Sequence, residues 1–329
     1  MHMIFRPLTL LFLATLLVTS SKAINFVFNY NDAPGVGFNH STQGAERRAG
    51  LEYAASKIGQ VFRAYSADIE IDVDGSVTED SALAGAAANY NFVPNNNGFD
   101  GRGDVELKIL GGNAADPNSG SADAEISWNF QDFSWEIGTD FQVGEYDFIS
   151  TAMHELLHTV GFSSDMLEDG SSYYDAIDTP TIWAPMDKFI GDRNGVLIDS
   201  NFVLNSGVWT SVSTGGTGTV PANLGLYFHG PNAMTAFGGN PVPLYSPTTW
   251  EDGSSVSHFD TDYFDGINAP ELLMNHAAPD GIGIREVDPL TVAFLQDIGF
   301  TQASIVPEAS TLAFLLISLG SLTFIRRRS

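Results

Sequence analysis

The chain has 329 residues, no cysteine, and 40 acidic residues against 14 basic ones, which gives a formal net charge of −26 at pH 7. Such an acidic surface repels a phosphate backbone, so the composition argues against a nucleic-acid partner. The acidic composition is compatible with binding of divalent cations or basic peptides. It is equally compatible with a solvated surface that binds no ligand. Because disulfides are impossible, stability must come from core packing and from bound metal.

Residues 1–23 have the pattern of a secretory signal peptide. Arg6 precedes an apolar run at 8–18, and the small residues Ser21 and Ala23 suit a cleavage site. The apolar run is too short and wrongly flanked for a membrane-spanning anchor. We therefore expect an exported protein whose mature chain begins directly after this segment.

The first part of the mature chain alternates between strand and helix patterns. Residues 44–65 carry apolar side chains at helical spacing and predict a long amphipathic helix. The alternation of apolar and polar residues that is typical of strands occurs at 24–30, 67–75, 104–110 and 124–130. The stretches 94–104 and 111–123 have loop composition. These patterns predict a fold of the α/β (α+β) class, in which one strand, one helix and three further strands precede residue 148.

The segment "HELLH" at 154–158 carries the strongest chemical signal. On a helix, residues four apart lie on one face, so His154 and His158 can direct their imidazoles at one metal ion. Glu155 lies beside them, where a carboxylate can act as a general base toward water without coordinating the metal. Gly161 stands where the helix must stop and suits a positive φ. The pattern predicts a catalytic zinc site rather than two surface histidines.

A catalytic zinc ion takes three protein ligands, and the residues near HELLH leave the third one open. Ser164 is a poor candidate because its hydroxyl stays neutral near pH 7. Asp165 has suitable chemistry, but it lies one residue beyond the position toward which the Gly161 turn would aim. His258 carries the right donor much later in the chain.

The mature chain has three further histidines, which we expect to play other roles. His40 lies in a polar loop and is expected at the surface. His229 lies in an aromatic-rich segment and is expected to have a structural role. His276 is expected at the surface or beside the ligands.

The sequence "HELLHTVGFS" resembles the leishmanolysin-like branch of the metzincin zinc metalloproteases, which has bacterial members. In that branch the third histidine follows a long insertion, which implies that His258, 100 positions after the second HELLH histidine, is the third ligand. The resemblance also implies that Met274, in "PELLMNHAAPDG", forms a methionine turn beneath the ligands. The segments 186–198 and 288–300 are similar to parts of such enzymes, the second of them to their closing helix.

The resemblance also implies a zincin fold. Such a fold has a twisted mixed sheet, two long helices of which one carries HELLH, and an irregular C-terminal subdomain with the methionine turn. The catalytic domain would span residues 24–304, with an insertion at about 166–257. An edge strand of the sheet would pair with an extended peptide substrate, and 124–130 is the candidate strand.

These features together predict a secreted zinc endopeptidase that uses water as the nucleophile. His154, His158 and His258 would hold Zn²⁺, and Glu155 would act first as general base and then as general acid. The alternative is a catalytically silent surface or matrix protein that keeps the fold for binding. The intact HELLH argues against it, because a degenerate enzyme usually loses its glutamate or a ligand. A narrower alternative keeps catalysis and makes Asp165 the third ligand.

The last residues, 305–329, have the pattern of a sorting segment. The sequence "PEA" precedes an apolar run at 311–325, and three arginines follow it. This pattern resembles a PEP-CTERM signal, with Ala309 in place of a proline, and implies an exosortase-type membrane enzyme as a partner. The arginines should stay in the cytoplasm. We expect a transient inner-membrane anchor, with the preceding domain in the periplasm, the cell envelope or the medium.

Overall fold

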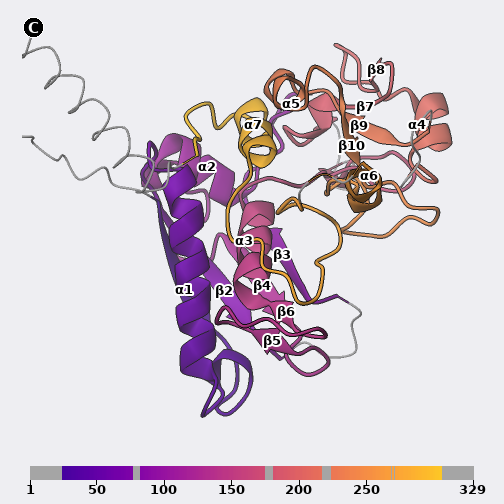
Figure 1. Ribbon diagram of the computed structural model, residues 1–329. Helices are drawn as coiled ribbons and strands as arrows, with labels where there is room; N and C mark the ends of the chain where they lie inside the picture. Colours follow the sequence, from indigo (N-terminus) through magenta and orange to yellow (C-terminus); the bar gives the residue numbers. More distant parts are fainter. Residues whose placement is uncertain are drawn as a thin grey trace, which may run out of the picture.

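The chain forms a mixed α/β fold with helices packed around two sheets (Figure 1). The computed structural model describes residues 24–76, 82–174, 181–216, 224–267, 269 and 271–305. The predicted signal peptide and residues 306–329 of the predicted sorting segment lie outside the described residues. In the described ranges, each helix is too short or too polar to cross a membrane.

The first sheet is four-stranded and mixed, with the order β1-β2-β4-β3. Strands β1, β2 and β4 run parallel, whereas β3 pairs antiparallel with β4 and is the outer strand on that side. The bounds are β1 Asn25–Tyr30, β2 Asp68–Asp74, β3 Ala84–Ala88 and β4 Ala124–Trp128. The strands predicted at 24–30, 67–75 and 124–130 are thus confirmed.

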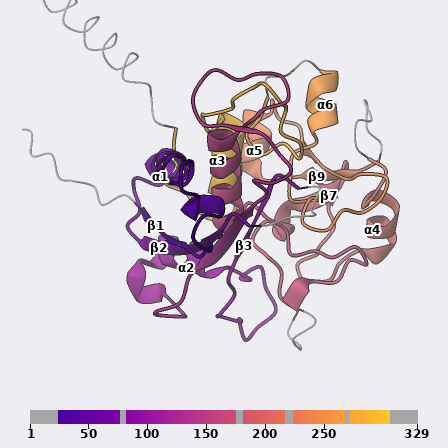
Figure 2. The ribbon, with the colours of Figure 1, turned by 90° about the horizontal axis from the view of Figure 1, so that it is seen from below.

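Two helices lie side by side on one face of this sheet (Figures 1 and 2). They are α1, Gly44–Val61, and α3, Phe148–Thr159. The sheet face beneath them is apolar, since Ile69, Ile71 and Val73 of β2 are completely buried. The helix predicted at 44–65 is confirmed, and α3 carries the HELLH segment. One continuous hydrophobic core joins the helices to the sheet.

The strand predicted at 104–110 is wrong, because this segment is the helix α2, Asp104–Gly111. Its apolar residues fit both a two-residue and a four-residue repeat, and the structure buries Val105 and Ile109, four positions apart. The acidic first turn favours a helix, since Asp104 and Glu106 complement its positive end. The Glu106 carboxylate also accepts a hydrogen bond from the Gly103 backbone.

The prediction that 124–130 forms an edge strand is also wrong. Strand β4 lies between β2 and β3 and is hydrogen-bonded on both sides. The outer strand is β3, which consists only of alanine and glycine. These residues have low strand propensity, so the segment has no strand signal of its own.

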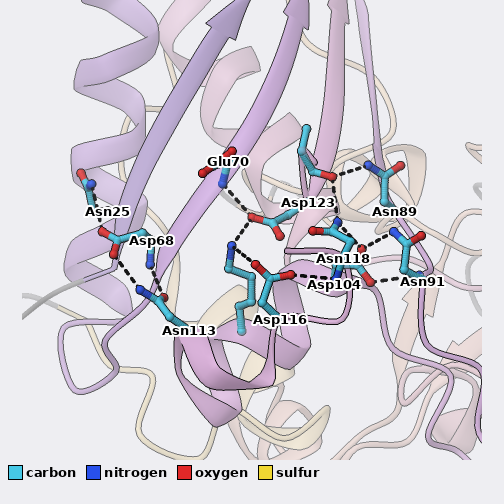
Figure 3. Close-up of polar contacts among 12 residues, drawn as sticks. Asn25, Asp68, Glu70, Asn89, Asn91, Asp104, Asn113, Asp116, Asn118 and Asp123 are labelled. Carbon is cyan, nitrogen blue, oxygen red and sulfur yellow. Dashed lines mark hydrogen bonds and ion pairs between the residues drawn. The ribbon is translucent and has the colours of Figure 1, made fainter. Parts of the chain in front are cut away.

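A polar network connects the far end of β3 to α2 and to the loop at 111–123 (Figure 3). The Asn89 side chain donates to the Ala122 carbonyl at 2.7 Å. The Asn91 and Asn118 side chains both donate to Asp104, at 2.6 and 2.8 Å. The chain on either side of residue 90 is therefore fixed in place by hydrogen bonds.

The C-terminal half contains a second four-stranded sheet, which is antiparallel and has the order β10-β9-β7-β8. Its strands are β7 Ile190–Asp192, β8 Gly195–Val196, β9 Leu226–Phe228 and β10 Val242–Leu244. The helices of this half are α4 Ser206–Val212, α5 Pro231–Ala236, α6 Thr261–Gly266 and α7 Pro289–Asp297. This second sheet, α4 and α5 all lie in the segment predicted as an insertion, 166–257.

Short elements complete the described fold. Strands β5, Trp135–Glu136, and β6, Tyr146–Asp147, form a small sheet just before α3. Short 3₁₀ helices occur at Gly37–Asn39, Asn113–Ala115 and Asp187–Phe189.

The helix α7 joins the two halves and lies within the predicted closing segment, 288–300. Its Phe294 ring stacks on Phe162, which follows α3, and on Phe228 of β9, with centroid distances of 4.0 and 3.9 Å. The stacked rings tie the end of the HELLH helix to the second sheet.

Candidate metal centre

The helix α3 is held at both ends. At its start, Asp147 accepts a hydrogen bond from the Ile149 backbone at 3.1 Å, which caps the helix. At its end, Gly161 adopts the predicted positive φ, +96°. A Cβ atom at this position would lie 2.6 Å from the Glu106 side chain, so only glycine fits here. The turn directs the following chain back along the helix.

Three histidines meet beside this turn. The Nε2 atoms of His154, His158 and His258 form a triangle in which every side is 3.0 Å. His258 lies in the loop that connects β10 to α6, and it is 6% exposed. The fold thus brings the late histidine to the two histidines of HELLH, across 100 positions of sequence.

Each ring of this group is oriented by a backbone carbonyl. The Nδ1 atoms lie 2.7 Å from the Leu273 oxygen for His154, 2.7 Å from the Phe162 oxygen for His158, and 2.8 Å from the Ser254 oxygen for His258. A carbonyl can only accept, so each Nδ1 carries the proton and donates it. Each Nε2 is then a free lone pair, and three lone pairs face one another.

This arrangement fits a metal ion. Three nitrogen lone pairs 3.0 Å apart repel each other unless a cation lies among them. Burial lowers the pKa of His154 to about 4 and that of His158 to about 3, so a shared proton does not supply the cation near neutral pH. The nitrogens are close enough for one ion to contact all three at about 2.0–2.1 Å. Among the described residues, these three are the group that could hold a metal ion.

Glu155 is buried in the same turn of α3, at 6% exposure. Burial raises its pKa to about 8, so the isolated carboxyl would hold a proton near pH 7. A cation bound nearby favours the ionised form and lowers this pKa. The carboxylate would then become a base only in the metal-loaded site.

Met274 lies in a turn that forms hydrogen bonds with His154 and with the residue after His258. Its side chain is fully buried. The residue before it, Leu273, supplies the carbonyl for His154, and the Met274 carbonyl accepts a hydrogen bond from the Phe259 backbone at 2.8 Å. Phe259 follows His258 directly, so this one turn positions the first and last histidines together. Of the predicted turn, Pro270 lies outside the described residues.

The two other candidates near HELLH have different partners. The Ser164 hydroxyl donates to Asp187 at 2.6 Å. Asp165 is 8% exposed and accepts a hydrogen bond from the Tyr90 hydroxyl at 3.2 Å. Burial raises the pKa of Asp165 well above its usual range. Neither residue belongs to the histidine group that could hold a metal ion.

The remaining histidines of the described chain also lie outside the group. His40 accepts hydrogen bonds at the start of α1, and His229 lies 2.6 Å from the Asp192 carbonyl, to which it donates. The His276 ring stacks on Tyr245, with a centroid distance of 3.6 Å.

A cleft of about 570 Å³ opens beside His158. Its walls come from β3, from the loops after α3, and from the loop that leads to His258. Sequence reasoning missed this cleft and the three carbonyl partners of the histidines. Every residue has a carbonyl, so no side-chain pattern marks such partners. The spacing gives one partial signal, since Phe162 and Ser254 each lie four positions from the histidine they orient.

No protein-family model matches the chain, and no curated protein matches it with significant similarity.

Proposed function

We propose that this protein is a zinc-dependent endopeptidase with a zincin fold, from the leishmanolysin-like branch of the metzincins. The observation that carries the proposal is the triangle of Nε2 atoms of His154, His158 and His258 next to Glu155. Three neutral imidazoles are ligands that zinc prefers, whereas calcium and magnesium prefer oxygen. The mixed sheet, the paired helices α1 and α3, and the buried Met274 turn are compatible with this family.

In the proposed reaction, the protein supplies orientation and proton transfer. A bound zinc ion provides Lewis acidity, which activates water and polarises the peptide carbonyl. Glu155 takes the proton from the attacking water and passes it to the leaving amine. The three carbonyl partners hold the histidine rings in one tautomer, which keeps every Nε2 available for the metal.

The substrate is expected to bind as an extended strand along β3. The backbone edge of an outer strand can pair with a peptide. Ala86, Ala87 and Ala88 of β3 line the same cleft as His158, so a peptide paired there would pass the metal site. The small alanine side chains leave room for larger side chains of the substrate.

The test combines metal analysis of the purified protein with digestion of casein, with and without a chelator. We expect about one zinc ion per chain and chelator-sensitive digestion. Glu155→Gln should keep the zinc and lose about 10²- to 10⁴-fold in hydrolysis, because it removes only the base. The exposed Glu46→Gln, far from the histidines in sequence, serves as the control with the same chemical change. Zinc binding without any hydrolysis would instead favour the silent binding protein.

We also propose export and sorting through the two chain ends, with an exosortase-type enzyme as the partner. Deleting residues 306–329 should release soluble protein with unchanged activity. Fractionation of cells that express the truncated chain tests this, and retention in the membrane fraction would count against it.

A further inference from the structure

The cleft beside His158 has an unbalanced charge. Of the described residues that line it, none is lysine or arginine, and three are acidic: Glu125, Asp165 and Asp252. None of these three forms an ion pair within the described part of the chain. Glu125 belongs to β4, Asp165 follows α3, and Asp252 lies in the loop before His258. Acidic side chains therefore reach the cleft from three separate segments.

The deepest of these acids has an unused oxygen. Asp165 is more than nine-tenths buried, and its Oδ1 accepts a hydrogen bond from Tyr90. Its Oδ2 is also buried but has no hydrogen-bond partner among the described residues. Burial raises the pKa of Asp165, so this carboxyl is neutral in the empty cleft. A cationic donor that enters the cleft would satisfy the unpartnered oxygen and favour the ionised carboxylate.

Aromatic rings surround these carboxylates. The Tyr90 ring lies 6.0 Å from Tyr173 and 5.6 Å from Tyr174, measured between centroids. Tyr173 is 51% exposed, although it is a large aromatic residue. The Trp250 indole donates to Asp252 at 2.9 Å, which places a ring and a carboxylate together in the cleft. Rings next to carboxylates are a setting that favours an organic cation.

A second metal ion does not explain this charge. Of the described residues, only the three histidines have ligand atoms gathered closely enough to share an ion. The acids of the cleft are spread out, so they suit a long side chain that carries its charge at the end. The backbone that carries Tyr90 is held on both sides, because the Asn89 and Asn91 side chains form hydrogen bonds (Figure 3).

We infer that the cleft selects peptides with a lysine or arginine side chain close to the bond that is cut, and that Asp165, Asp252 and Glu125 recognise its charge. This inference rests on the proposed function for the cutting step alone, since recognition of the side chain requires no hydrolysis. The high negative charge of the whole chain acts in the same direction, because it attracts basic peptides over a distance.

The experiment uses the zinc-loaded full chain with Glu155→Gln, which binds peptide without cutting it. Two labelled peptides differ only in one arginine, which is replaced by citrulline in the second. Citrulline has almost the same shape but no charge. We expect the arginine peptide to bind about tenfold more tightly, as measured by fluorescence polarisation, and this preference to weaken with added salt.

Variants of the cleft locate the preference. Asp252→Asn and Glu125→Gln should each reduce the arginine-to-citrulline ratio about two- to fivefold, as for a solvent-exposed ion pair. Asp165→Asn should reduce it most, and Glu46→Gln should leave it unchanged. Equal binding of the two peptides overturns the inference. So does a ratio that survives removal of all three cleft acids, because recognition would then lie elsewhere.

Failure of the inference is distinct from failure of the proposed function. Casein digestion by the unmodified chain, together with equal binding of the two peptides, overturns the inference and leaves the endopeptidase in place. A strong arginine preference without any digestion keeps the inference and rejects the endopeptidase.

Discussion

The backbone oxygen of Leu273 lies 2.7 Å from Nδ1 of His154. The residue that precedes the buried Met274 thus orients the first histidine of the candidate metal centre. The next carbonyl, that of Met274, accepts the backbone hydrogen of Phe259 and so positions His258. One short turn therefore couples two candidate ligands that are more than 100 positions apart in sequence. This gives the turn a role that its buried methionine alone would not explain.

Removing the late histidine should release the metal. His258→Ala deletes one of three nitrogens, so we expect zinc content to fall well below one per chain and hydrolysis to be lost. Asp165→Asn is the matched control, because Asp165 lies outside the histidine group and should leave zinc content near normal. Elemental analysis after dialysis measures both. Zinc that is retained by His258→Ala and lost by Asp165→Asn would transfer the ligand role to Asp165.

The second prediction concerns a buried ion pair at the start of α3. Arg285 donates from Nε and Nη2 to Asp147 at 2.8 and 2.5 Å, and the Asp147 side chain is 1% exposed. Arg285→Met would leave this carboxylate buried and unpaired, and should lower the free energy of unfolding by about 3–5 kcal/mol.

The neighbouring ion pair provides the control for this measurement. Lys57 pairs with Glu286, which follows Arg285 directly, but these side chains are 24% and 71% exposed. Lys57→Met should therefore lower the free energy of unfolding, measured with urea, by at most about 1 kcal/mol. Equal losses for the two variants would show that burial of Asp147 does not control the strength of its pair.

The sequence predicted those elements whose side chains alternate clearly between core and solvent. Strand β2 is an example, since Ile69, Ile71 and Val73 face the core and the acidic residues between them do not. The prediction failed for α2, where the apolar residues fit both the two-residue repeat of a strand and the four-residue repeat of a helix. No pattern predicted β3, whose alanine and glycine residues have low strand propensity and pair with β4.

The candidate site divides in the same way. The two histidines of HELLH follow from helix geometry, and His258 was reached through the resemblance rather than from spacing. The carbonyls that orient the rings, and the cleft acids Asp252 and Glu125, depend on tertiary contacts between distant segments. Such contacts have no local pattern, so the sequence alone does not reveal them.

Metal removal should destabilise the whole fold. Without a cation, the lone pairs of His154, His158 and His258 repel one another inside the core. Zinc that binds only the folded chain should stabilise it by about 2.7 kcal/mol when its concentration is 100 times Kd. Thermal unfolding after chelation should therefore show a lower Tm, which zinc restores and magnesium does not. An identical Tm with and without zinc would mean that the ion does not bind this group.

The last prediction concerns Asp187, which is fully buried beside the turn that follows α3. Burial raises its pKa to about 7, although it accepts hydrogen bonds from the Ser164 hydroxyl and the Ala184 backbone. The folded chain therefore binds a proton at Asp187 that the unfolded chain has already released above its ordinary pKa near 3.8. The contribution of Asp187 to the free energy of unfolding is fully present below the ordinary pKa near 3.8. It is lost as the pH rises to about 7. The slope is about 1.4 kcal/mol per pH unit for one proton. The asparagine of Asp187→Asn cannot titrate. The free energy of unfolding, measured with urea between pH 4.5 and pH 7, should therefore fall less steeply with pH for this variant than for the unmodified chain. Parallel curves for the two proteins would assign the pH dependence to other buried acids, such as Glu106.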